Sequence, residues 1–453
     1  MKNKIKKLLL LIGDIIILYS SLYLTLLVRY GEQPSVHLWQ VHLLPFSLAF
    51  IFWLLIFYIS DLYNINIAVN NSKFFKNTTR SVFIAGLLTA VFFYINPNIN
   101  IAPKTNLVIY IIIFTLLFLG WRRLFNWTIF AKFPKENIAI IGYNQNVQEL
   151  IKTLKEKPHL SYKTELVISS RVKPGILKDI NIIDDIGNLK QQIIRFKIST
   201  IIFAANPHQS AELRKILFSC LPLKINFISL ARFYENITGK IPLEALSQMW
   251  FLENLSEGNK HLFGLLKRSY DLALAIIILL LTAPFWPIIA LLLKLENKES
   301  IFFRQTRTGK DNQTFRIIKF RTQRTIDNIP APSSENDPRT TRIGNIFRKT
   351  RIDEIPQIIN IINGDMSFIG PRPERPELVE KLKPEIPFYD ERMLVKPGLS
   401  GWDQVSGKYH SPSKEDTLKK LQYDLYYVKN RSLYLDLSIM LKTIATVLRQ
   451  SGV

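Results

Sequence analysis

Long apolar runs in the first third of the chain are the feature that most limits how it can fold. Four such runs lie at about residues 8–28, 43–59, 81–95 and 107–121, and the third is short. A helical run of roughly twenty apolar residues matches the hydrocarbon core of a bilayer, which is about 30 Å thick. A cleavable signal is conceivable for the first run, but the run is long and has no clear small-residue cleavage site, which favours a transmembrane helix. The sequence therefore predicts four transmembrane helices.

Cations gather in the loops on one side of these runs. Four lysines precede the first run, three cations separate the second from the third, and four cations follow the fourth. The loop after Arg29 has none, and the loop before the fourth run has only Lys104. Because cationic loops stay in the cytoplasm, both ends of the four-helix bundle are predicted to be cytoplasmic.

The overall charge indicates an anionic partner. Lysine and arginine outnumber the acids by 59 to 36, for a formal net charge of +23. Nucleic acid, an acidic membrane face and phosphorylated substrates all fit such an excess, and the apolar runs favour the membrane over nucleic acid. The single cysteine, Cys220, excludes an internal disulfide and suits a reducing compartment.

Alternating strand and helix patterns follow the apolar runs. Strands are predicted at 137–142 and 198–204, with helices at 147–154 and 211–217. This order is typical of a small doubly wound, Rossmann-like domain, placed at residues 133–255 after a membrane region at 1–132. Its first turn, Gly142-Tyr-Asn-Gln-Asn, contains one glycine, so a dinucleotide site is poorly supported. A structural or regulatory module is the prediction.

A fifth apolar segment, at 271–293, has cations before and after it and prolines at 284 and 287. The flanking charges disfavour moving either end across the bilayer, and each proline breaks the helical hydrogen-bond ladder. We therefore predict a re-entrant helix that returns to the cytoplasmic face. An ordinary fifth spanning helix with a proline kink is the alternative.

Two adjacent carboxylates, Asp353 and Glu354, come shortly after Arg348 and about twenty residues before Arg372, which lies in a rigid Gly-Pro-Arg-Pro turn. A carboxylate can attack phosphorus or hold a metal while guanidinium groups neutralise phosphate oxygens. Judged from these residues alone, a solvated ion-pair cluster at a helix start is the more common explanation. The surrounding segments decide between the two.

Three further segments complete the C-terminal part. Residues 315–322 alternate apolar and basic side chains, which predicts a strand with Lys319 and Arg321 on one face. Residues 325–339 are rich in Pro, Ser, Asn and Asp and predict a mobile loop. Residues 437–448 predict a closing amphipathic helix.

From about Lys267 onward the sequence closely resembles the bacterial sugar transferases, the monotopic phosphoglycosyl transferases. With the preceding membrane helices and Rossmann-like domain it resembles their large form, the polyprenyl-phosphate hexose-1-phosphate transferases. The resemblance is carried by ordered blocks over more than one hundred residues: Phe302-Phe-Arg-Gln, Phe320-Arg-Thr, Asp337-Pro-Arg, Thr341-Arg-Ile-Gly, Arg348-Lys-Thr, Asp353-Glu-Ile-Pro-Gln, Asn363-Gly-Asp-Met-Ser, Gly370-Pro-Arg-Pro-Glu-Arg-Pro-Glu, Val395-Lys-Pro-Gly and Gly401-Trp.

The resemblance implies a mechanism. Asp353 matches the aspartate that attacks the β-phosphorus of a UDP-sugar, releases UMP and holds the sugar phosphate covalently until polyprenyl phosphate displaces it. Glu354 matches the acid that, with Asp353, holds Mg²⁺. Arg348 and Arg372 match phosphate-contacting arginines by position. Lys319 and Arg321 are assigned to substrate or lipid headgroup on charge and position only.

The resemblance also implies partners and a location. The substrates would be a UDP-sugar and undecaprenyl phosphate, with Mg²⁺ as cofactor, membrane lipid around the re-entrant helix and a homodimer as the assembly; nucleic acid is not an expected partner. The catalytic domain, residues 256–453 and of mixed α/β type, would face the cytoplasm at the bacterial inner membrane. The reaction would begin the assembly of an exopolysaccharide, capsule or O-antigen.

The chain departs from the family pattern at three places. Asp403 stands where the family usually has a small residue, Gln323 replaces the usual methionine, and Ala283-Pro284 replaces Ser-Pro. None of them removes a catalytic group, but with Asp403 at this position the sequence does not predict whether the turn contacts the substrate.

Two other functions were weighed. A membrane-bound nucleotide-sugar dehydratase would need a Tyr-x-x-x-Lys pair, which the chain lacks. A non-catalytic scaffold or regulator of polysaccharide assembly remains the alternative. The sequence does not identify the sugar.

Overall fold

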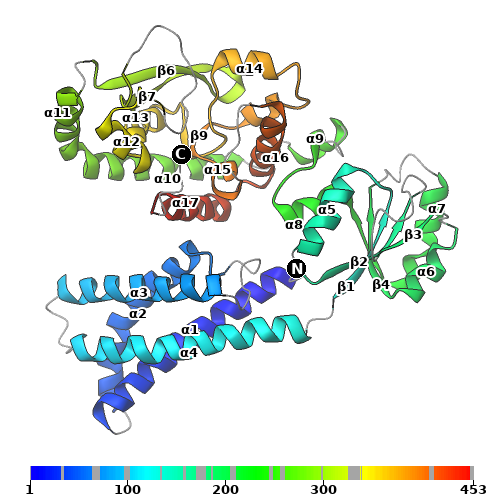
Figure 1. Ribbon diagram of the computed structural model, residues 1–453, viewed down its shortest axis with the longest axis horizontal. Helices are drawn as coiled ribbons and strands as arrows, with labels where there is room; N and C mark the ends of the chain where they lie inside the picture. Colours follow the sequence, from blue (N-terminus) through cyan, green and yellow to red (C-terminus); the bar gives the residue numbers. More distant parts are fainter. Residues whose placement is uncertain are drawn as a thin grey trace. The chain divides into compact units, whose positions relative to one another are not determined.

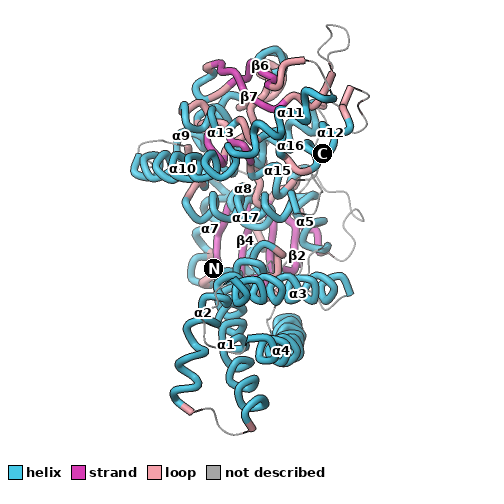
Figure 2. The backbone as a smooth tube through the Cα atoms, turned by 90° about the vertical axis from the view of Figure 1, so that its left-hand side faces the viewer, coloured by secondary structure: helices cyan, strands magenta, loops and turns pink. Residues whose placement is uncertain are grey.

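The computed structural model describes residues 2–31, 35–63, 72–95, 103–132, 135–156, 160–169, 180–184, 187–204, 211–243, 248–255, 261–296, 299–324, 337, 339–407 and 413–448. The contacts divide the chain into two compact units, Met1–Ile228 and Ser229–Val453, which are described separately. Of the predicted loop at 325–339, all but Asp337 and Arg339 lie outside the described residues. In both units most described residues are helical (Figure 2).

Four long helices open the first unit: α1 (Lys2–Tyr30), α2 (Val36–Ile59), α3 (Ser72–Ile95) and α4 (Pro103–Lys132). Each contains one of the predicted apolar runs and extends beyond it, and each is long and apolar enough to cross a bilayer. Aromatic rings fill the core between them. Phe57 and Phe114 each stack with Phe118, at centroid distances of 4.8 and 4.9 Å, while many other apolar side chains stay exposed. The chain is a membrane protein.

A buried ion pair joins the first and last of these helices. Asp14 of α1 and Arg122 of α4 are fully buried, with Oδ2 and Nη2 2.6 Å apart. The indole of Trp121 donates to Asp14 Oδ1 at 3.1 Å, and Arg122 also donates to the carbonyl of Leu62 at 2.7 Å. Both oxygens of the acid therefore have a donor inside the helix bundle.

The rest of the first unit is an α/β domain. Its strands are β1 (Glu136–Ile141), β2 (Tyr162–Ile168), β3 (Asn181–Ile183), β4 (Ile198–Phe203) and β5 (Asn226–Ser229), which ends one residue into the second unit. Its helices are α5 (Gln145–Glu156), α6 (Leu189–Arg195) and α7 (Ala211–Ser219), followed by the 3-10 turn η3 (Leu221–Leu223). The sheet order is β3-β2-β1-β4-β5. β1 pairs in parallel with β2 and β4, as does β2 with β3.

Alternation along the strands explains how the helices cover this sheet. Ala139 and Ile141 of β1 pack in one cluster with Leu189 of α6 and Leu217 of α7, and side chains that alternate with them point to the other face. Figure 1 shows α5 on one side of the sheet and α6 and α7 on the other. The predicted α/β class is confirmed. The predicted strands correspond to β1 and β4, whereas β2, β3 and β5 were not anticipated.

The second unit mixes helices with short strands. Its helices are α8 (Leu230–Thr238), α9 (Gln248–Asn254), α10 (His261–Thr282), α11 (Trp286–Glu296), α12 (Arg342–Lys349), α13 (Gln357–Asn363), α14 (Pro376–Leu382), α15 (Trp402–Ser406), α16 (Lys414–Asn430) and α17 (Leu433–Leu448). Its 3-10 turns are η6 (Ala283–Phe285), η7 (Lys310–Asn312), η8 (Ile352–Glu354) and η9 (Asp390–Leu394). Strands β6 (Phe302–Thr308) and β7 (Thr314–Phe320) form an antiparallel hairpin, and β8 (Ser367–Ile369) pairs in parallel with β9 (Gly398–Ser400).

The segment that links the two units packs with the second. Lys429 and Asn430 of α16 donate to Glu235 of α8 at 2.7 and 2.6 Å, and the indole of Trp402 donates to the carbonyl of Gly239 at 2.9 Å. The sequence predicted that the Rossmann-like domain extends to residue 255, whereas the contacts divide the chain after Ile228. The pattern of strands and helices contained no signal for this docking.

The fifth apolar segment is broken at its prolines. α10 and α11 are joined by η6, which contains Pro284, and Pro287 lies just inside α11. A proline removes one backbone donor and clashes with the preceding turn, which explains why the helix breaks here. Figure 1 shows α11 turning away from the line of α10. Few of the residues in its most apolar stretch are buried.

Both ends of this broken segment contact the same folded unit. Near the start of α10, Arg268 donates to two carbonyls at the end of α13, at 2.6 and 2.7 Å. At the end of α11, Glu296 accepts from the first two amides of α12, at 2.7 and 3.0 Å. Leu293, Phe320 and Phe347 form a small apolar cluster beside this contact.

Candidate functional site

The two predicted acids lie in the short turn η8 between α12 and α13. Arg351, which precedes the turn, adopts a left-handed conformation with φ 59°, and this reversal ends the path of α12. Pro356 then starts α13 at a φ that a proline ring favours. Asp353 and Glu354 are both buried, with 8% and 7% of their surfaces exposed.

Three cations surround Glu354. Lys319 Nζ donates to Oε1 at 2.7 Å, Arg372 Nη2 reaches the same oxygen at 3.4 Å, and Arg351 Nη1 lies 3.3 Å from Oε2. Burial opposes ionisation of Glu354, but these cations outweigh it, Lys319 most strongly, and they hold the pKa well below its usual range. Glu354 is therefore an anion at the centre of a cationic cluster.

An asparagine positions Lys319. Asn360 of α13 is buried, accepts from the Ile318 amide at 3.1 Å and donates to the Arg316 carbonyl at 2.8 Å. These are backbone groups of β7, on the edge that β6 does not pair. The side chain of Asn360 thus joins β7 to α13, and Lys319 is carried to Glu354 by this contact.

Two glycines bring the Arg372 turn close to the strand β9. A Cβ at Gly370 would lie 2.3 Å from the Lys396 carbonyl oxygen, and one at Gly398 would lie 2.1 Å from the Gly370 nitrogen. No side chain fits in either position, so the backbones pack directly against each other. The Pro-Arg-Pro sequence follows this contact, and its two prolines restrict the direction of the backbone. Arg372, between them, points to Glu354.

A second buried ion pair holds the same turn from behind. Arg392 and Asp424 are 2% and 1% exposed, with Nε and Oδ2 2.9 Å apart. Arg392 also donates to the backbone carbonyl of Arg372 at 2.8 Å. Sequence reasoning missed Arg392 and Asp424, because they meet only in the fold. It also missed the contact of Arg351 with Glu354, although these residues are only three apart in the chain.

Asp353 differs from its neighbour. Its Oδ1 is buried and has no hydrogen-bond partner among the described residues. Burial, and after it the charge of Glu354, raises the pKa of Asp353 to about 6, although Lys319, Arg351 and Arg348 act in the opposite direction. Above that pH the site holds an ionised carboxylate with one unoccupied oxygen, which is the state that a nucleophile needs.

Of the two remaining predicted residues, Arg348 lies near the acids and Arg321 does not. Arg348, in the last turn of α12, donates to Thr340 at 3.1 Å and lies close enough to Asp353 to lower its pKa. Arg321 does not join the cluster. It donates to Glu299 at 2.9 Å and to the Ser300 carbonyl at 3.0 Å. Of the two cations predicted on the basic strand, the structure brings only Lys319 to the acids.

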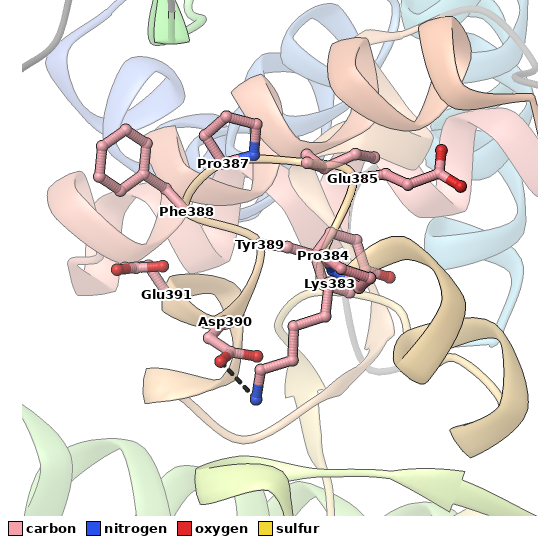
Figure 3. A pocket seen from close by; sticks show the side chains of 9 residues that line it. Lys383, Pro384, Glu385, Pro387, Phe388, Tyr389, Asp390 and Glu391 are labelled. Carbon is pink, nitrogen blue, oxygen red and sulfur yellow. Dashed lines mark ion pairs between the residues drawn. The ribbon is translucent and has the colours of Figure 1, made fainter.

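A pocket elsewhere in the second unit contains none of these residues. Its volume is about 370 Å³, and it is formed by the consecutive residues 383–391, which connect α14 to η9. Figure 3 shows Lys383 turned toward Asp390, 2.6 Å away, while Phe388 projects to the other side. The acids of η8 do not line it.

The donor set around Asp353 fits a magnesium ion only as a shared site. Mg²⁺ prefers six oxygen ligands and is often held by one or two carboxylates together with substrate phosphates and waters. Asp353 Oδ1 is an unoccupied oxygen of this kind, whereas both Glu354 oxygens already contact cations. Among the described residues no group of three or more His, Cys, Asp or Glu side chains converges on one point. Phosphate oxygens would have to supply further ligands.

Together these features define a class: a membrane protein with a buried carboxylate pair inside an arginine and lysine cluster, beside a broken apolar helix. Residues 262–450 match the bacterial sugar transferase family, and residues 58–231 match a family described as a CoA-binding domain. The chain belongs to the bacterial sugar transferase family, and the resemblance predicted from the sequence is confirmed.

Three relatives illustrate the match. A UDP-N-acetylgalactosamine-undecaprenyl-phosphate N-acetylgalactosaminephosphotransferase of Aeromonas hydrophila is 38% identical over 54% of this chain, and the alignment covers 57% of that protein. A UDP-glucose:undecaprenyl-phosphate glucose-1-phosphate transferase of Escherichia coli (strain K12) is 29% identical over 95% of this chain and 93% of that protein. The exopolysaccharide production protein PSS of Rhizobium leguminosarum bv. phaseoli is 37% identical over 40% of this chain and 95% of that protein.

Proposed function

We propose that this protein transfers a sugar 1-phosphate from a UDP-sugar to undecaprenyl phosphate and releases UMP. The observation that carries the proposal is the pairing in η8 of an ion-paired acid with an acid whose Oδ1 has no partner in the part of the chain that the structure describes. The names of the relatives support both substrates, although those names differ in the sugar. The sugar is therefore left to experiment.

The proposed chemistry has two steps. An Asp353 oxygen attacks the β-phosphorus, a carboxylate–phosphorus bond forms, and the bond from that phosphorus to the UMP oxygen breaks, with the electron pair leaving on UMP. An oxygen of undecaprenyl phosphate then attacks the same phosphorus and releases Asp353 as a carboxylate. One phosphoanhydride replaces another overall, so the reaction is expected to be nearly thermoneutral and reversible with UMP.

The cations perform the electrostatic part of this chemistry. Lys319, Arg351 and Arg372 converge on Glu354, and Arg348 lies near Asp353. Their charge offsets the repulsion between the acids and a diphosphate in a buried site, where such interactions are stronger than in water. A bound Mg²⁺, for which Asp353 and Glu354 are the proposed protein ligands, would add positive charge at the phosphate oxygens.

The broken helix is proposed to be re-entrant. Arg268 at one end and Glu296 at the other both contact the folded second unit. The segment from Leu262 to Glu296 has 35 residues, and a straight helix of that length would extend about 50 Å, well beyond a bilayer core. A break that returns the chain to one face keeps Asp353 at the interface, where a soluble nucleotide and a lipid phosphate can meet.

The loop charges support a cytoplasmic orientation. We propose that the catalytic unit lies on the cytoplasmic face of the bacterial inner membrane, and that its reaction is the first membrane step of surface polysaccharide or glycoconjugate assembly. Homodimer formation is also proposed, and light scattering of the solubilised protein would test it.

The test is a comparison of wild type with Asp353→Ala. Protein solubilised in detergent or polymer is incubated with undecaprenyl phosphate, Mg²⁺ and a panel of UDP-sugars that starts with UDP-glucose and UDP-N-acetylgalactosamine, and UMP is measured. We expect UMP release with one UDP-sugar, and we expect this release to be lost in Asp353→Ala and when Mg²⁺ is chelated. Release that persists in Asp353→Ala would contradict the proposal. Silence with every sugar would favour a non-catalytic scaffold.

A further inference from the structure

Two buried polar atoms close together in the chain have no hydrogen-bond partner among the residues that the structure describes. One is Asp353 Oδ1 and the other is Gln357 Nε2, and neither forms a hydrogen bond to any described residue. Gln357 is 2% exposed. A buried donor or acceptor without a partner costs about 1–3 kcal/mol, so two within five residues require an explanation.

The backbone places these side chains on neighbouring positions. η8 ends at Glu354, Ile355 (φ −54°, ψ −40°) and Pro356 (φ −61°, ψ −15°) remain right-handed helical, and α13 begins at Gln357. The amides of Ile355, Ile358 and Ile359 donate to carbonyls three residues earlier, which is the bonding of a 3-10 path. The unpartnered acceptor and the unpartnered donor therefore belong to adjacent turns of one short helical path.

The cations of the site do not supply the missing donor. Lys319, Arg351 and Arg372 all donate to Glu354. A neutral amide can orient the carboxylate without adding another charge to the site.

We propose that Gln357 is a positioning residue, whose Nε2 donates to Asp353 Oδ1 when substrate is bound and so directs Oδ2 at phosphorus. This inference rests on the proposed function. Oδ2 forms the bond to phosphorus as UMP leaves with the electron pair, and Oδ1 becomes the carbonyl oxygen of the covalent intermediate. The same hydrogen bond then stabilises Asp353 as it departs in the second step, and no proton is transferred.

Another amide in the same helix provides a matched control. Asn360 is also 2% exposed, but its side chain bonds Ile318, Arg316 and Asp365. Removing a bonded amide leaves buried backbone groups unsatisfied, whereas removing an unpartnered donor relieves a cost. A structural role and a positioning role therefore predict opposite changes in stability.

The experiment measures the midpoint temperature of unfolding, kcat and KM for UMP release in the full-length solubilised protein. Gln357→Met keeps the length of the side chain without its donor. We expect kcat to fall about 10- to 100-fold, the KM for the UDP-sugar to stay within about twofold, and the midpoint temperature to stay equal or rise. Gln357→Glu, which replaces the donor by an acceptor, should lose more activity. Asn360→Leu should lower the midpoint temperature by several degrees.

Three results would overturn the inference. The first is a kcat of Gln357→Met equal to that of wild type. The second is a raised KM with unchanged kcat, which would make Gln357 a substrate-binding group. The third is a midpoint temperature that falls as far as in Asn360→Leu. If Asp353→Ala is inactive while Gln357→Met is fully active, only this inference fails. If Asp353→Ala is active, the proposed function fails with it.

Discussion

The membrane helices and the catalytic unit each contain a buried acid next to an arginine, and the two arrangements differ in one respect. In the helix bundle, Asp14 accepts from Arg122 on one oxygen and from Trp121 on the other. In the catalytic unit, Glu354 is also paired with cations, but the adjacent Asp353 has an oxygen that none of the described residues contacts by a hydrogen bond.

This difference distinguishes an acid with a structural role from an acid that can react. An ion pair whose acid has all its partners can fix two helices against each other, and little in it is free to react. An acid that stays buried without a partner is costly, and such cost is expected where a group must change its bonding during a reaction. The predictions below test this comparison, in order of decreasing effect.

The largest effect is expected in the helix bundle. Asp14→Asn leaves Arg122 as a buried charge without its counter-ion and should destabilise the folded protein by about 3–5 kcal/mol. The double variant Asp14→Leu/Arg122→Met removes both charges and should recover most of that loss. Thermal unfolding in one detergent measures both. Equal damage in the single and double variants would mean that the pair does more than fix these helices.

A smaller loss, in activity rather than stability, is expected at Glu354. Glu354→Gln removes the anion on which Lys319, Arg351 and Arg372 converge, and UMP release should fall roughly a hundredfold as those cations lose their arrangement. Glu299→Gln, which removes the partner of Arg321 instead, is the control and should change the rate less than twofold. Similar losses in both variants would contradict the central place given to Glu354.

The two cations of the basic strand should differ. Lys319→Met removes one cation of the cluster and should lower UMP release about tenfold. Arg321→Met leaves the cluster intact, because Arg321 pairs with Glu299, and should keep more than half the rate. Initial rates at saturating UDP-sugar decide this, and the reverse ranking would overturn the geometry assigned to β7.

The smallest effect concerns another buried acid, Asp403. Burial, then the charge of Asp424, raises the pKa of Asp403 to about 7 in the folded protein. In the unfolded chain the pKa of the same carboxyl is ~4. The folded protein therefore loses stability as pH rises between these values. Asp403→Asn cannot ionise and should match wild type near pH 4 but unfold a few degrees higher at pH 8. Parallel pH curves for the two proteins would contradict this.

Part of this molecule could be predicted from its sequence. The apolar runs mark α1 to α4 because bilayer thickness dictates helix length, and Pro284 and Pro287 mark the break because proline ends a helical ladder locally. The blocks from Phe302 to Trp402 identify the family through residues that are close in the chain. These signals lie in short stretches of sequence, so they can be read without knowing the fold.

The rest depends on contacts between distant segments. Lys319 and Arg321 are equivalent in the strand pattern, but in the fold the first pairs with Glu354 and the second with Glu299. The pairing of Arg392 with Asp424, which supports the Arg372 turn, joins segments more than thirty residues apart. The docking of α8 on α16 has no periodic signature, because Glu235 accepts from Lys429 and Asn430, which lie 194 and 195 residues later in the chain.

The most direct test of the account is the mass of the protein during turnover. Solubilised wild type is mixed with its UDP-sugar in the absence of undecaprenyl phosphate, quenched in acid and digested, and the peptide that contains Asp353 is weighed. The account predicts an added sugar phosphate on Asp353, which disappears when the lipid acceptor is supplied and is absent in Asp353→Asn. Turnover without any adduct, or an adduct on another residue, would contradict it.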